Sequence, residues 1–167
     1  IIGFIHASSA GFAIVTAQRF GAQDKAGVRK SFCTTIICGA LIGGLMTLFG
    51  VAYTGEILEL LQTPPEIFQD AYRYLIIIVG GIYVSVLFNV LSCTILALGN
   101  SKTPLFFLAI ACVLNIFLDY LFILHFKWGV AGAAYATVFS QLISGLFCLL
   151  YVLRKLQFLI PRKEDWK

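Results

Sequence analysis

The sequence predicts an all-α fold, a polytopic bundle of transmembrane helices, from its composition and its long apolar runs. Of the 167 residues, 60% are hydrophobic and only 12% are charged, whereas soluble domains have about 45–50% apolar and about 25% charged residues. Four apolar runs are each long enough to cross a hydrocarbon core of about 30 Å as a helix. Because a spanning segment must satisfy its own backbone hydrogen bonds, these runs are predicted to be helices rather than strands.

Five predicted spans follow one another along the chain. The first, residues 1–17, is the most polar because it contains Ser8, Ser9 and Thr16, and we expect it to be the end of a longer span. The other four are residues 32–53, 75–98, 105–126 and 130–153, with turn-forming residues between them. Residues 56–61, after the second span, are amphipathic and are expected to lie at the outer membrane surface.

Basic residues predict the orientation of the bundle. If each span crosses the membrane once, ten of the twelve Lys and Arg residues fall on one side. Cytoplasmic loops of membrane proteins are enriched in Lys and Arg, so that side is predicted to be cytoplasmic. It includes residues 154–167, which are predicted to form a cytoplasmic linker. The same rule accounts for the net charge of +4 without a nucleic-acid partner.

The start of the sequence suggests that more chain precedes it. It opens with Ile1 and Ile2, and its one methionine, Met46, lies within the second span. An outside start with no visible signal peptide implies another span before Ile1, which would give six helices and then a linker. Because many secondary transporters consist of two repeated halves, we expect part of one six-helix lobe of a twelve-helix transporter.

One acidic residue, Asp119, lies inside a predicted span. A charged side chain at a helix centre costs roughly 2.5 to 3.5 kcal/mol on insertion scales, so acids inside membranes usually face a cavity and serve an ion or proton pathway. Two structural interpretations stay open. In the first interpretation, the Asp119 carboxyl is permanently protonated. In the second, it pairs with a basic group outside this sequence.

Other polar residues are predicted to lie near Asp119. Asn115 is one turn earlier on the same helical face, and Thr137 on the next span shares the expected depth, about 10 Å below the outer boundary. Their oxygens are hard ligands suited to a small cation such as Na+, or to hydrogen bonds around a protonated acid. Alternatively, Thr137 bonds its own helix backbone. Asn89, on the span 75–98, either joins helices or lines a lumen.

Enzymatic chemistry has no support in the sequence. There is no phosphate loop, no nucleophile with a positioned base, and no metal-ligand spacing, so we predict neither catalysis nor a cofactor. The cysteines lack the paired spacings of metal or redox sites and are interpreted as small buried apolar residues. They are Cys33, Cys38, Cys93, Cys112 and Cys148.

Short motifs occur in a fixed order along nearly the whole chain. They include AQRFGAQD at 17–24, ALGNSKTP at 97–104, NIFLDY at 115–120 and GVAGAAYAT at 129–137. In their order and spacing they resemble the multidrug and toxic compound extrusion (MATE) family of cation-coupled exporters. The resemblance implies that the spans are helices two to six of the amino-terminal lobe.

The resemblance also implies a site. In prokaryotic members of that family, an Asn and an Asp of helix five and a Thr of helix six form a cation or proton site with an Asp of helix one. Asn115, Asp119 and Thr137 match the first three, while the helix-one Asp is not in this sequence. Tyr74 and Asn89 resemble supporting members of the surrounding polar network.

The resemblance implies a secondary active antiporter that spans the cell (plasma) membrane several times. In a prokaryote this is the inner membrane. The antiporter would export amphiphilic or cationic drugs or metabolites in exchange for Na+ or H+, in contact with lipids, and would need its first helix and a carboxy-terminal lobe of the same chain. Two alternatives stay open. A lipid-linked oligosaccharide flippase would be expected to line its cavity with basic residues, and a nonfunctional membrane fragment would transport nothing.

Overall fold

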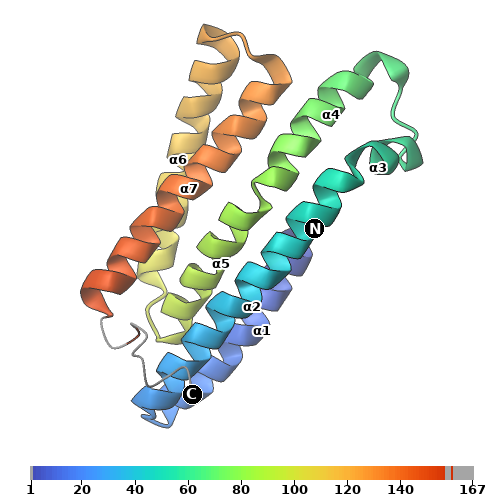
Figure 1. Ribbon diagram of the computed structural model, residues 1–167. Helices are drawn as coiled ribbons and strands as arrows, with labels where there is room; N and C mark the ends of the chain where they lie inside the picture. The colour runs from blue at the N-terminus through green and yellow to red at the C-terminus, as the bar shows by residue number, and fades with distance from the viewer. Residues whose placement is uncertain (1, 157–158, 160–167) are drawn as a thin grey trace.

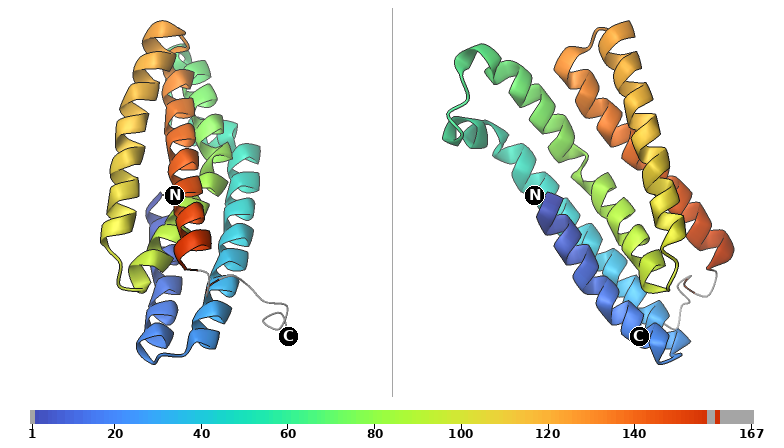
Figure 2. Two further views of the ribbon diagram at one scale, coloured as in Figure 1. Left: turned by 90° about the vertical axis from the view of Figure 1, so that its left-hand side faces the viewer. Right: turned by 180° about the vertical axis from the view of Figure 1, so that it is seen from behind.

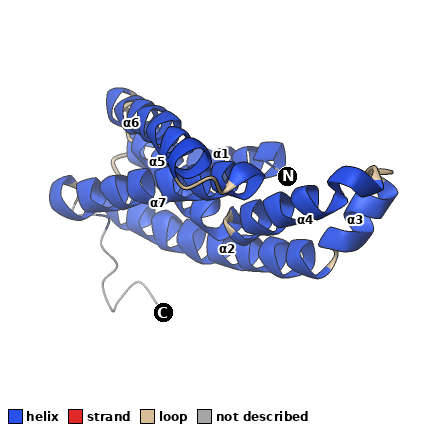
Figure 3. Ribbon diagram, turned by 90° about the horizontal axis from the view of Figure 1, so that it is seen from above, coloured by secondary structure: helices blue, strands red, loops and turns tan. Residues whose placement is uncertain are grey.

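A computed structural model describes residues 2–156 and Leu159, and this part of the chain is a helical bundle without strands (Figure 3). Its elements are α1 (Ile2–Gly21), α2 (Lys25–Ala52), α3 (Thr54–Leu60), α4 (Pro65–Gly80), α5 (Ile82–Ala97), α6 (Lys102–Asp119), the π-helix η1 (Tyr120–His125) and α7 (Gly129–Lys155). The predicted all-α fold is confirmed. Helix α3 corresponds to the amphipathic segment expected after the second span.

The turn between α1 and α2 is closed by side chains. The Asp24 carboxylate accepts a hydrogen bond from the Gly27 backbone N–H at 2.9 Å, and the Arg19 guanidinium donates to the Gly27 carbonyl at 2.9 Å. Asp24 thereby caps the first turn of α2. Helix α2 therefore begins at Lys25, earlier than the predicted residue 32.

The third predicted span, residues 75–98, was wrong in both extent and continuity. Helix α4 begins at Pro65, whose fixed backbone angle suits the first turn of a helix, and the axis then bends by 42° between α4 and α5. At the bend, a Cβ on Gly81 would overlap the Val138 side chain of α7. Glycine therefore allows the broken span to approach α7 closely.

The fourth predicted span, residues 105–126, is helical but changes its hydrogen-bonding pattern. Helix α6 ends at Asp119 and continues as η1, after which the Phe126 N–H bonds to the Leu121 carbonyl at 3.0 Å. π-Helical turns are rare and are frequently found at functional sites. The change falls directly after the one acidic residue of the predicted spans.

Three described helical segments are long and apolar enough to span a membrane: α2, α6 with η1, and α7. The bent pair α4 and α5 makes a fourth if it is counted as one span. Helix α1, predicted as the end of a span, is not among them. Its Ser9 and Thr16 are only 3% and 1% exposed, since α1 packs along α2 and against α5 (Figure 2).

The basic connections gather at one end of the bundle (Figure 1). The α1–α2 turn, the α5–α6 turn and the end of α7 lie at the lower end, whereas the α3–α4 connection and the turn from η1 to α7 lie at the upper end. Arg19, Lys25, Lys102, Arg154 and Lys155 belong to the lower end by their positions in these elements. This arrangement is the one that the predicted orientation requires.

The main core lies between α2, α5 and α7. Helix α7 continues through Lys155, beyond the predicted end at residue 153, and Leu159 of the predicted linker is fully buried in this core. Residues 157–158 and 160–167 of that linker lie outside the described residues. The buried members are Val28, Phe32, Phe88, Leu91, Ile95, Cys148, Val152 and Leu159.

Candidate functional site

Helices α6 and α7 are packed neighbours that bring Asn115 and Thr137 together. The Asn115 amide nitrogen donates to the Thr137 hydroxyl oxygen at 3.4 Å, and the same hydroxyl donates to the Ala133 carbonyl at 3.0 Å. The second bond is the backbone contact considered as an alternative for Thr137. The two contacts coexist, so the hydroxyl is held by its own helix while it receives the amide of the neighbouring one.

Asp119 lies one turn beyond Asn115, at the junction of α6 and η1. Its side chain is half-buried, and its Oδ1 atom is buried without a hydrogen-bond partner in the described part of the chain. Among those residues, Asp119 bonds neither Asn115 nor Thr137. An unsatisfied buried polar group costs about 1–3 kcal/mol, and more when it is charged. This oxygen is therefore suited to receive a proton or a cation.

A close helix contact follows shortly after Asp119. A Cβ on Gly132 of α7 would lie 3.1 Å from the Cβ of Phe122 and 3.2 Å from its carbonyl carbon and oxygen. Glycine thus lets α7 approach η1 directly after the carboxylate. No feature of the sequence signalled the π-helix.

A cavity of about 620 Å³ lies beside this cluster, between α4, α5 and α7. Three of the residues singled out from the sequence, Tyr74, Asn89 and Thr137, line it. Tyr74 is 37% exposed, and the Asn89 amide nitrogen donates to the Ser85 carbonyl at 2.8 Å. The complete lining is Gly3, Tyr74, Leu75, Ile78, Val79, Ile82, Ser85, Phe88, Asn89, Leu108, Thr137, Val138 and Gln141.

The predicted residues form two connected parts rather than one. Thr137 lines the cavity and also contacts Asn115, whereas Asn115 and Asp119, both on α6, are not among the lining residues. Thr137 is therefore the member shared by the cavity and the polar cluster.

Sequence reasoning missed two polar residues of the cavity, Ser85 and Gln141. Ser85 is one turn before Asn89, and Gln141 is one turn after Thr137, so helical spacing from the predicted residues would have found both. The Ser85 hydroxyl donates to the side-chain carbonyl of Gln141, which joins α5 to α7.

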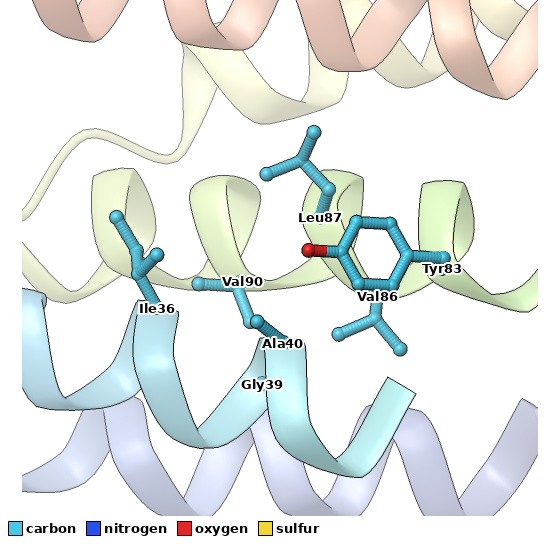
Figure 4. A pocket seen from close by; sticks show the side chains of 7 residues that line it. All are labelled: Ile36, Gly39, Ala40, Tyr83, Val86, Leu87 and Val90. Carbon is cyan, nitrogen blue, oxygen red and sulfur yellow. The ribbon is translucent and has the colours of Figure 1, made fainter. Parts of the chain in front are cut away.

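A second, much smaller pocket lies between α2 and α5 (Figure 4). Its volume is about 40 Å³, and the tyrosine hydroxyl is the polar side-chain group in its lining. It is too small for a drug-sized molecule. The lining residues are Ile36, Gly39, Ala40, Tyr83, Val86, Leu87 and Val90.

Comparison with known proteins identifies the family. The MatE family model matches residues 1–121. The chain belongs to the MatE family. Together with its apolar helices, this membership makes the MatE chain a multi-pass membrane protein.

Curated relatives of this MatE chain are named as transporters. The probable multidrug resistance protein YpnP of Bacillus subtilis is 37% identical over 172 residues, a match that covers 100% of this chain and 38% of the relative. The multidrug export protein MepA of Staphylococcus saprophyticus is 27% identical, with 89% of this chain and 34% of the relative covered. The chain spans less than two fifths of the length of these relatives.

Solved structures with the same fold include a multidrug resistance MATE family transporter of the MOP superfamily. Its inward-facing conformation matches with a TM-score of 0.84 and 25% identity, covering 97% of this chain and 40% of that one. A structure described as the outward-facing conformation of such a transporter matches with a TM-score of 0.86 and 25% identity, covering 99% of this chain and 39% of that one. The predicted transporter architecture is thereby confirmed for this part of the fold.

Proposed function

We propose that the native protein containing this MatE chain is a secondary active antiporter of a prokaryotic cell membrane. It exports amphiphilic or cationic compounds in exchange for Na+ or H+. The names of the relatives, multidrug resistance and multidrug export proteins, support the class of activity.

The observation that carries ion coupling is the unpaired buried oxygen of Asp119. A proton or a cation on this carboxylate removes the electrostatic cost of a charge inside the bundle. The neutral and the charged forms then favour different conformations of the transporter, and the exported compound favours one of them. Binding of the ion from outside thereby drives release of the compound to the outside, and release of the ion inside allows another molecule of the compound to bind there.

Asn115 and Thr137 support this role through their contact. Both carry an oxygen that can serve as a hard ligand for Na+, and both can hydrogen-bond a protonated carboxyl. Tyr74 and Asn89 supply further polar groups to the adjacent cavity. Thr137 couples the two parts because it belongs to both.

The cavity fits an amphiphilic compound better than a lipid-linked oligosaccharide. Its wall is mostly apolar with a few polar side chains, as is typical of small-molecule sites. None of its described lining residues is basic, whereas the phosphate groups of a lipid-linked sugar would call for basic side chains.

The test is transport by the purified native protein in proteoliposomes. We expect ethidium to move against its own gradient when a Na+ or H+ gradient is imposed in the opposite direction, and to stop when that gradient is collapsed. Ethidium movement that is the same with and without either gradient would refute antiport.

A further inference from the structure

Helices α5 and α7 pack against each other through a series of contacts spaced about one turn apart. One of these contacts, between Ser85 and Gln141, differs in chemistry from the others. The contact positions rise together along both helices, so the two helices run in the same direction. Three contacts involve small or weakly polar groups, and one joins a hydroxyl to an amide. In order, the pairs are Gly81 with Val138, Ser85 with Gln141, Phe88 with Gly145, and Ser92 with Cys148.

The hydroxyl–amide contact lies in the wall of the cavity. Both Ser85 and Gln141 line the cavity, and the Gln141 carbonyl oxygen accepts the Ser85 hydroxyl. The amide nitrogen of Gln141 carries two N–H donors and has no hydrogen-bond partner within the described chain. Ser85 therefore fixes the amide in one orientation and leaves its donors available to the contents of the cavity.

We propose that Gln141, oriented by Ser85, is a specificity-determining residue that donates a hydrogen bond to an acceptor oxygen of the bound amphiphile. The inference rests on the proposed export function. It assigns Ser85 the role of a positioning residue and Gln141 that of a ligand contact.

The acceptor that Gln141 selects is a neutral one. The described lining contains no basic side chain, so a carboxylate in the cavity would lose its hydration without gaining a positively charged partner. A ketone, ester or ether oxygen loses little hydration and satisfies the amide donor. A compound without such an oxygen forgoes this hydrogen bond, and the net loss of one hydrogen bond weakens its binding about 3- to 10-fold.

The experiment compares two cationic probes of nearly the same shape, 4-acetylphenyl-triphenylphosphonium and 4-isopropylphenyl-triphenylphosphonium. They differ by one carbonyl oxygen in place of a methyl group. Their dissociation constants for the native protein are measured by equilibrium dialysis. We expect the acetyl probe to bind about 3- to 10-fold more tightly than the isopropyl probe.

Three variants test the assignment. Gln141→Leu removes the donor and is expected to abolish the preference, and Gln141→Glu also abolishes it while tightening the binding of both cations. Ser85→Ala keeps the amide donor of Gln141 but removes the hydroxyl that orients it, so the preference for the acetyl probe is expected to be reduced. The matched control is Ser92→Ala, which removes a hydroxyl from the same series of contacts outside the cavity lining and is expected to retain the preference.

Failure of the proposed role of Gln141 can be distinguished from failure of the proposed amphiphile cavity. If both probes bind but the native protein shows no preference, or if Gln141→Leu and Gln141→Glu retain it, the role of Gln141 is refuted and the export function stands. If neither probe binds the native protein, the proposed amphiphile cavity is refuted and the role of Gln141 with it. Should Gln141→Leu fail to fold, Gln141→Glu and Ser85→Ala decide the outcome.

Discussion

Asn100 and Tyr151 are joined by a hydrogen bond of 2.9 Å from the asparagine amide nitrogen to the tyrosine hydroxyl. The same amide nitrogen donates to the Thr103 hydroxyl at 2.8 Å, and the Asn100 carbonyl oxygen accepts the Thr103 backbone N–H at 3.1 Å. One side chain thus caps the first turn of α6 and ties the α5–α6 turn to the last turns of α7.

This link predicts a stability loss on mutation. Asn100→Ala removes the cap and the bond to Tyr151, and we expect it to lower the free energy of unfolding by about 1–2 kcal/mol. Tyr151→Phe removes one hydrogen bond and should cost about 1 kcal/mol. Thermal unfolding of the detergent-purified protein measures both. In the Asn100→Ala background, Tyr151→Phe should have little further effect, and full additivity would contradict the link.

The approach of α7 to η1 predicts that Gly132 does not tolerate a methyl group. In Gly132→Ala, the new Cβ would press on the Phe122 backbone, and overpacking of this kind costs about 1–3 kcal/mol. Gly44→Ala on α2 is the matched control, because nothing lies within 4 Å of its added Cβ. Alanine in a helix interior is favoured over glycine by about 0.5–1 kcal/mol. Equal melting temperatures for the two variants would argue against the close contact.

The gathering of basic residues at one end predicts the topology. Single cysteines placed at exposed Lys25 and exposed Gln62, in a variant without the native cysteines, should report opposite sides of the membrane. We expect a membrane-impermeant thiol reagent to label the Gln62 position in intact cells and the Lys25 position only after the cells are opened. Labelling of Lys25 from outside would reverse the orientation.

Much of the fold follows from local sequence. The apolar runs predict most of α2, α6 and α7. Counting residues from the turn near Trp128 predicted one depth for Asp119 and Thr137, whereas the structure joins Thr137 to Asn115, one turn before Asp119. The bend at Gly81 could not be predicted, and the residue that Gly81 approaches closely, Val138, lies far along the chain. The π-helix likewise lies where Gly132 of α7 closely approaches Phe122. Both features coincide with contacts between distant parts of the chain, which the local pattern of apolar residues does not reveal.

Asn115 and Thr137 are expected to be supporting residues for ion coupling, so that losing either one weakens coupling without abolishing it. Asn115→Ala and Thr137→Ala each remove one partner of the same 3.4 Å bond, so each should weaken the dependence of export on the ion gradient several-fold rather than abolish it. The double variant should be less impaired than two independent losses would predict. Thr137→Ser keeps the hydroxyl and should stay close to the native protein. A Thr137→Ser variant as impaired as Thr137→Ala would indicate that packing, not the hydroxyl, matters.

The most direct test of the account is gradient-driven export by Asp119→Asn in the native protein, normalised to its amount in the membrane. The amide nearly preserves the shape of the carboxyl, but it can neither release a proton nor offer a negative charge to a cation. We therefore expect normal membrane expression with loss of at least about tenfold in export of a fluorescent cation, a change of about 1.4 kcal/mol or more. Export by Asp119→Asn at the native rate, under the same gradient, would contradict the coupling role of Asp119.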